Sequence, residues 1–287
     1  MDPRTVRVGL EAEFALVDDG GRLADFRSLP FTAAQAVVDR LDPQAHPALR
    51  KGDLGIKRGR WYVEGDERFD DTGQLLDCAP KGVETRTPPA VGIDDAVEAL
   101  RHQSAALGAA AAADGYRLAS IGWNPFAERY CPRPPYGAWE RAMRACEPVY
   151  LAPDVYMMSY GPDVNLSHPS WDDSDVVLIA RRLTALSPVL VPFSFSAPFA
   201  VGGRAGPWSI RTGARTGRRP AATAFVASHA VPDQQPSPPL IRPARIPAER
   251  GRIEFKAFDA VVDPAWYPAL VALVIGVALS QIGGIGA

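Results

Sequence analysis

Apolar and polar residues alternate in several short stretches of the chain, which is the pattern of β-strands that bury one face. The first stretch spans residues 6–17 and has apolar side chains at every second position. It predicts a strand whose core face carries Val8, Leu10, Ala12, Phe14 and Leu16. Glu11 and Glu13 then share the opposite face with Ala15, because successive side chains of a strand point to opposite sides.

The remaining chain divides into helical and extended segments by the same criterion. Helical periodicity with start and stop signals predicts helices at 32–41, 94–114, 139–146 and 172–190, and a closing helix from Pro264. Extended segments are predicted at 53–69 (a hairpin or two short strands), 83–87, 118–123, 155–166 and 252–258. Residues 204–220 are predicted as a loop, and the Pro-rich residues 231–247 as a loop or an inserted lid. Regular βαβ alternation is missing, so the pattern favours an α+β fold with a mainly antiparallel sheet.

Composition and length limit the number of domains, the classes of partner and the cellular compartment that we expect. With 287 residues, 47% of them hydrophobic, it can form one large globular domain or two small ones. The net charge of −2 argues against nucleic acid or a membrane surface as a partner. The first residues lack the apolar core of a signal peptide, and the apolar run 269–279 is shorter than the roughly 20 residues that span a bilayer. We therefore expect a cytoplasmic protein, and the sequence leaves room for a homo-oligomer.

Three predicted strands carry carboxylates on their polar faces. Glu11 and Glu13 repel each other at this spacing, and a hard divalent cation with oxygen ligands relieves that repulsion. A solvated outer face would tolerate the pair equally well. Glu84 shares a strand face with Arg86 and follows Asp77, a pattern also expected of a surface ion pair. Glu254 and Lys256 repeat the arrangement near the end of the chain, so the three strands together suggest a sheet with a cation-filled face.

Arginine and glycine alternate in residues 211–219. Mobile backbone amides beside guanidinium groups suit phosphate oxygens, although a basic surface loop has the same composition. The candidate phosphate-binding residues here are Arg211, Arg215 and Arg218. The chain has no GxxxxGK[ST] loop, no GxGxxG after a strand and no GxSxG elbow, and its four histidines lack metal-ligand spacing.

Five motifs in order along the chain resemble the glutamate–cysteine ligase superfamily, in particular its bacterial carboxylate–amine ligase branch. They are GLEAEF (9–14), GVETRTPP (82–89), DVNLSH (163–168), SAPFAVGGRAGPWSIRTG (196–213) and RIEFKAFDA (252–260). The resemblance implies a single catalytic domain over 1–287, similar to that of glutamine synthetase, with a curved antiparallel sheet forming a funnel around metal ions. It also implies that ATP phosphorylates a substrate carboxylate and that an amine then displaces phosphate to give an amide.

The resemblance assigns roles residue by residue. The expected metal ligands for Mg²⁺ or Mn²⁺ are Glu11, Glu13, Asp77, Glu84, Asp163 and Glu254. Asp163 stands where the family has a metal-binding histidine, and Asn165 would contact the nucleotide with Arg211, Arg215 and Arg218. Glu13, Arg211 and Lys256 are the expected catalytic residues, with Lys256 in place of the usual arginine. The partners would be ATP, an amino acid and an amine.

Two other functions fit the same residues. The departures at Asp163 and Lys256 would suit a non-catalytic relative that binds nucleotide or an amino acid and acts through a partner. A kinase on the same fold would stop at a phosphorylated product.

Overall fold

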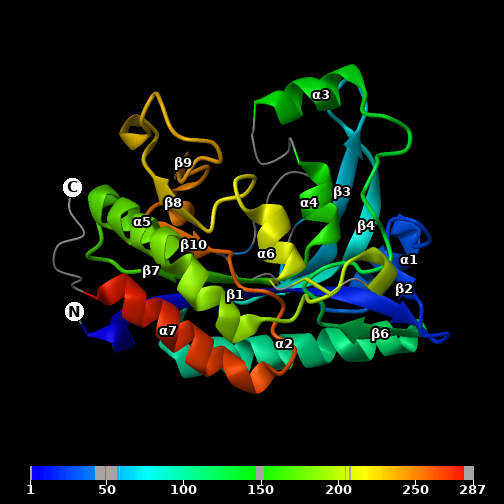
Figure 1. Ribbon diagram of the computed structural model, residues 1–287, viewed down its shortest axis with the longest axis horizontal. Coiled ribbons are helices and arrows are strands. Elements are labelled where there is room, and N and C mark those ends of the chain that lie inside the picture. Colours follow the sequence, from blue (N-terminus) through cyan, green and yellow to red (C-terminus); the bar gives the residue numbers. More distant parts are fainter. Residues whose placement is uncertain are drawn as a thin grey trace.

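The computed structural model describes residues 2–42, 49, 57, 59–146, 152–203, 205–206 and 208–280. These residues form a ten-stranded sheet whose main path runs β3-β4-β1-β7-β10-β8-β9 (Figure 1). Neighbours along this path are antiparallel except for β8 and β9, which are parallel. The prediction of an α+β fold with a mainly antiparallel sheet is confirmed.

The strands of the sheet include two long ones and several short ones. They are β1 (Arg7–Asp18), β2 (Leu23–Ala24), β3 (Trp61–Phe69), β4 (Leu75–Arg86), β5 (Ala90–Val91), β6 (Tyr116–Ala119), β7 (Pro162–Ser167), β8 (Ala222–Val226), β9 (Ile241–Pro243) and β10 (Arg252–Phe255). The α-helices are α1 (Phe31–Asp39), α2 (Ile93–Ala113), α3 (Ala138–Ala145), α4 (Pro153–Met158), α5 (Asp173–Leu190), α6 (Ile210–Arg215) and α7 (Tyr267–Leu279).

Strand β1 lies at the centre because its apolar positions pack on one face and its backbone pairs on both edges. It pairs with β4 on one side and β7 on the other, and its ends also pair with β2, β5 and β6. Val8, Leu10 and Ala12 are buried in the main core, as the alternation predicts.

Helices α2, α5 and α7 cover the core face of the sheet, and α2 and α7 lie on the lower side in Figure 1. Helix α5 begins with a capping box in which Asp172 accepts from the backbone N–H groups of Ser174 and Asp175. Pro188 lies inside its last turns, and the helix ends at Leu190, as the sequence predicts. Residues 173–194 are long and apolar enough to cross a membrane by composition, but the helix buries Val176, Ile179, Ala180, Leu183 and Leu190 in this core.

The opposite face of the sheet carries α4 and α6, and the β3–β4 ribbon extends beyond it to α3 (Figure 1). Three predictions differ here. Residues 155–166 form the end of helix α4 followed by β7, because Pro153 starts a helical turn that the strand pattern conceals. Residues 210–215 within the predicted loop form α6, which Ser209 caps by accepting from the N–H of Thr212. Residues 61–69 form one strand of nine residues instead of two short ones; residues 53–56 and 58 lie outside the described part.

Candidate functional site

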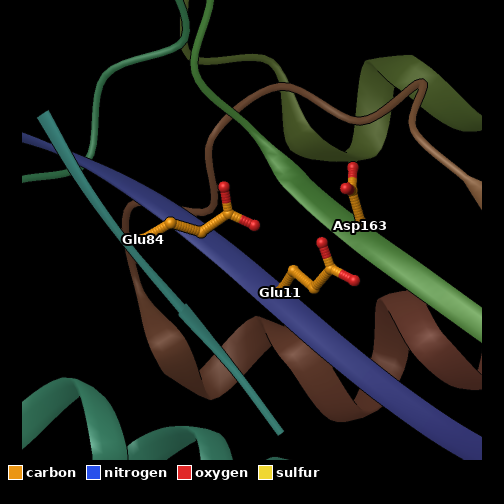
Figure 2. Close-up of side chains that lie close together, drawn as sticks. All are labelled: Glu11, Glu84 and Asp163. Carbon is orange, nitrogen blue, oxygen red and sulfur yellow. The ribbon is translucent and has the colours of Figure 1, made fainter. Parts of the chain in front are cut away.

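Sheet register brings three carboxylates from three strands together. Glu11 on β1 lies opposite Asp163 on β7, and Glu13 lies opposite Glu84 on β4. Residues directly opposite in an antiparallel pair point to the same face, so these side chains share the face away from the core. One oxygen from each of Glu11, Glu84 and Asp163 lies within 4.8 Å of the others. Figure 2 shows the three side chains close together on neighbouring strands, and we call them the first acidic group.

A second acidic group lies beside the first and shares Glu84 with it. Its other members are Glu13 and Glu64, again with one oxygen each within 4.8 Å of one another. Glu64 comes from β3 and was not predicted from sequence. In the structure Tyr62 lies opposite Glu84, so Glu64, two residues further along the same strand, points to the same face; the sequence does not show this register.

Positive and amide groups contact the edge of the first acidic group. Lys256 Nζ lies 2.5 Å from Asp163 Oδ2 and 3.5 Å from Glu254 Oε2. Asn165 donates from Nδ2 to Glu11 Oε1 at 3.0 Å and accepts from Arg252 Nη1 at 3.0 Å. Glu254 therefore lies on the same polar face at the edge of the first acidic group, where it pairs with Lys256 and Arg252.

The charges at the centre are unevenly balanced. Burial and the charges of Glu64, Glu11, Glu13 and Asp163 raise the pKa of Glu84 well above its usual value. Burial alone would also raise the pKa of Glu11, but Lys256, Arg252 and Arg86 hold it below its usual value. Burial opposes the charged form of Lys256, yet the neighbouring carboxylates of Asp163, Glu254 and Glu11 raise its pKa. Glu84 is thus the buried acid that lacks a compensating cation among the described residues.

Helix α6 directs arginines toward this centre. Arg211 is buried and donates from Nη1 to the carbonyl of Ala257 at 3.1 Å and from Nη2 to that of Lys256 at 3.2 Å. It packs against Gly161, where a Cβ atom would lie 2.3 Å from its Nη2 atom. The guanidinium thus fixes the backbone that follows β10. The role expected from sequence, binding of phosphate or of a substrate carboxylate, stays a prediction.

Arg215 follows one turn later in α6. Burial and the charges of Arg211 and Arg219 lower its pKa, while Asp163 and Glu13 act in the opposite direction. Within the part of the chain that the structure describes, its side chain has no hydrogen bond or ion pair. Arg219 lies over the Tyr156 ring at 5.4 Å. Three guanidinium groups, those of Arg211, Arg215 and Arg219, therefore lie beside the carboxylates, an arrangement that suits an anion.

Two predicted site residues lie apart from this centre. Asp77 is exposed on β4, seven residues from Glu84, which at about 3.3 Å per residue is on the order of 20 Å along the strand. Its carboxylate accepts from the backbone N–H of Cys78. Arg218 is exposed and pairs with Asp154 at 3.3 Å. The structure therefore does not place Asp77 with the two acidic groups or Arg218 with the other arginines.

The donor set of the first acidic group fits a hard divalent cation. Carboxylate oxygens are the ligands that Mg²⁺ and Mn²⁺ prefer. Glu84 is 4% exposed and its carboxylate points into the group, so a cation there would offset the cost of burying it. Glu11, Glu84 and Asp163 are the residues that would hold such an ion.

Comparisons with known proteins concern the fold and the family of the chain. The chain resembles the crystal structure of a bifunctional glutathione synthetase from Pasteurella multocida, with a TM-score of 0.55 and 11% sequence identity. The match covers 97% of this chain and 40% of the other, so the likeness concerns the fold. No curated protein matches the sequence. The sequence model of glutamate-cysteine ligase family 2 (GCS2) matches residues 7–219, and this chain belongs to that family of ligases.

Proposed function

We propose that the protein is an ATP-dependent carboxylate–amine ligase that works through an acyl phosphate. The observation that carries the proposal is the first acidic group, in which the buried carboxylate of Glu84 meets Glu11 and Asp163 and, among the described residues, has no compensating cation of its own. Family membership supports the ligase class, and the arginines of α6 supply positive charge beside the carboxylates. Glu11, Glu84 and Asp163 would hold a divalent ion, which would supply positive charge to offset that of the phosphate groups.

The chemistry requires two displacements. A substrate carboxylate oxygen attacks the γ-phosphorus of ATP, the bond to the β-phosphate oxygen breaks, and ADP leaves. The lone pair of an amine then attacks the acyl carbon, phosphate leaves with the carbon–oxygen bond electrons, and the nitrogen loses a proton. In this scheme Lys256 and Arg215 orient anionic oxygens, and Arg211 holds the backbone from which Lys256 extends.

The test uses purified protein with Mg²⁺, ATP and pairs of amino acids and amines. We expect ADP and phosphate to appear only when a carboxylate and an amine are both present, and hydroxylamine in place of the amine to give a hydroxamate. Glu84→Gln should lower turnover by at least about 100-fold, because it removes a charged oxygen ligand. Asp77→Asn is the matched control, since it alters an exposed carboxylate of the same strand, and it should retain turnover.

The alternatives give different results in the same assay. Nucleotide binding without ADP release from any amino acid and amine pair would contradict the ligase and favour a non-catalytic binding protein. A stable phosphorylated product that no amine displaces would identify a kinase. Full turnover in Glu84→Gln would remove the metal assignment.

A further inference from the structure

The second acidic group already contains a cation supplied by the chain. Lys81 Nζ lies 2.9 Å from Glu13 Oε1 and 3.9 Å from Glu64 Oε1. It also donates to the carbonyls of Ser159 at 2.8 Å and Tyr156 at 3.2 Å. An ammonium group has three donors, and Glu13 with the two carbonyls accounts for all three. The side chain is 1% exposed, so this ammonium is held in place.

A β-bulge brings Lys81 to this face of the sheet. By simple alternation an odd-numbered position on β4 would face away from Glu84, and Lys81 would point to the core. The register between β3 and β4 shifts here, with Glu64 opposite Gly82 but Gly65 opposite Pro80, so Lys81 is the extra residue. A bulge of this kind turns a side chain toward a new direction.

Two glycines make the bulge possible. A Cβ atom at Gly82 would lie 2.0 Å from the carbonyl oxygen of Phe14, and one at Gly65 would lie 2.3 Å from that of Ala79. Larger residues at either position would push the strands apart. The local sequence around Lys81 is therefore built for this close approach, and the approach places an ammonium group among carboxylates.

The two acidic groups differ in how their charge is balanced. In the second group Glu13 pairs with Lys81, and Glu64 pairs with Lys57 at 2.8 Å. In the first group Glu11 contacts the neutral amide of Asn165, and Asp163 pairs with Lys256. The Lys256 side chain is 34% exposed, on a long stem that can move aside, whereas Lys81 is enclosed.

We propose that Lys81 acts as a built-in cation in the second acidic group, so that the protein without nucleotide binds one divalent ion, at Glu11, Glu84 and Asp163. A second dication among Glu13, Glu64 and Glu84 would have to approach an ammonium group that cannot leave. The inference rests on the proposed function, since it assigns the number of ions in the same site. Lys81 is then a positioning residue: it holds the Glu13 carboxylate in place and is not itself a metal ligand.

The test counts Mn²⁺ bound to the full chain, from the electron paramagnetic resonance signal of free Mn²⁺ during titration. We expect one bound ion per chain in the wild-type protein. Glu64→Gln alters only the second group and should leave one ion with an affinity within about threefold of the original. Glu84→Gln should weaken binding by at least about 100-fold. These measurements do not depend on turnover.

The decisive variant is Lys81→Met, which keeps the length of the side chain and removes its charge. It should bind two Mn²⁺ ions, and their proximity should broaden the bound signal by magnetic coupling. Adding Glu64→Gln to Lys81→Met should return the count to one. Lys256→Met is the matched control at the other lysine, and it should change affinity while the count stays at one. If circular dichroism shows that Lys81→Met does not fold, wild type and Glu64→Gln still decide the question.

Different failures have different meanings. Two ions in the wild type, falling to one in Glu64→Gln, would overturn the role of Lys81 and leave the ligase proposal standing. A count of one in a folded Lys81→Met would also overturn it. No bound ion in the wild type would overturn both the inference and the metal centre of the proposed function.

Discussion

The β3–β4 ribbon carries two buried clusters of charged residues with opposite properties. At its inner end Glu64 and Glu84 belong to the acidic groups, where carboxylates meet carboxylates. At its outer end a second cluster, here called the arm network, joins β3 to α3 and consists of Asp66, Arg68, Tyr130, Tyr136, Glu140 and Arg144.

Every charge of the arm network has a partner within it. Asp66 accepts from Arg144 at 2.6 Å and from the hydroxyl groups of Tyr130 at 2.6 Å and Tyr136 at 2.8 Å. Arg68 donates twice to Glu140, at 2.7 and 3.0 Å. A matched buried network fixes one arrangement of the chain, whereas Glu84, which has no compensating cation among the described residues, would be stabilised by an added one. The same residue types therefore hold structure at one end of the ribbon, and at the other end they form the groups that we propose bind a cation.

The largest effect on stability should come from breaking the arm network. Arg144→Met removes the cation beside Asp66, which is 2% exposed. Leaving a buried charge without its partner costs about 3–5 kcal/mol of unfolding free energy. Urea unfolding should show this loss equally with and without Mg²⁺. A loss below about 1 kcal/mol would mean that the network does not hold α3 to the ribbon.

At the inner end of the ribbon we expect a smaller effect on stability, and one that depends on metal. Mg²⁺ at 100 times its dissociation constant should stabilise the wild-type protein by about 2.7 kcal/mol, and Glu84→Gln should lose this increment. Without metal the variant should be at least as stable as the wild type, because a repelling carboxylate has been removed. Thermal unfolding with Mg²⁺ and with EDTA measures both quantities. Arg144→Met should still be stabilised by Mg²⁺ to the same extent as the wild type. If Mg²⁺ does not stabilise Arg144→Met, the two clusters do not act separately.

The smallest effect should appear on acidification. Burial alone would raise the pKa of Glu140, but hydrogen bonds from Arg68, Gly137 and Phe69 lower it to about 2 from the ordinary value of 4.5. A lowered pKa means that the stabilisation is complete above about pH 4.5 and disappears as the pH falls toward 2. The difference in unfolding free energy between wild type and Glu140→Gln should be about 1.5–3 kcal/mol at neutral pH and should shrink through this window. A difference that stays constant down to pH 2 would show that Glu140 is not ionised in the network.

Alternation along the chain predicted the parts of the site that lie on regular strands. Glu11, Glu13 and Glu84 point to the face expected of them, and β1 is bounded within one residue of its prediction. Asp163 and Asn165 also share the expected face, although the strand that carries them is half as long as predicted. Period-2 patterning is robust here because one face of each strand is buried.

Alternation failed where the backbone departs from regularity or where distance along a strand matters. Lys81 changes face at a bulge. The bulge depends on close backbone contacts of Gly65 and Gly82, and no pattern in the sequence predicts these contacts. Asp77 has the right residue type on the right strand but lies several positions beyond the site. The role of Arg211 was hidden because its partners are backbone carbonyls after β10, which no sequence pattern marks.

The position of β1 between β4 and β7 limits how this chain can change during evolution. A slip of β1 by one residue against β4 and β7, which the loss or gain of a residue near its start would cause, would turn Val8 and Leu10 outward and bury Glu11 and Glu13 in the core. Lineages that keep the fold must therefore keep the length of this strand, while point substitutions remain open to them. New substrate preferences should arise in segments that can vary in length without moving β1, such as the connection that carries α3 over the ribbon.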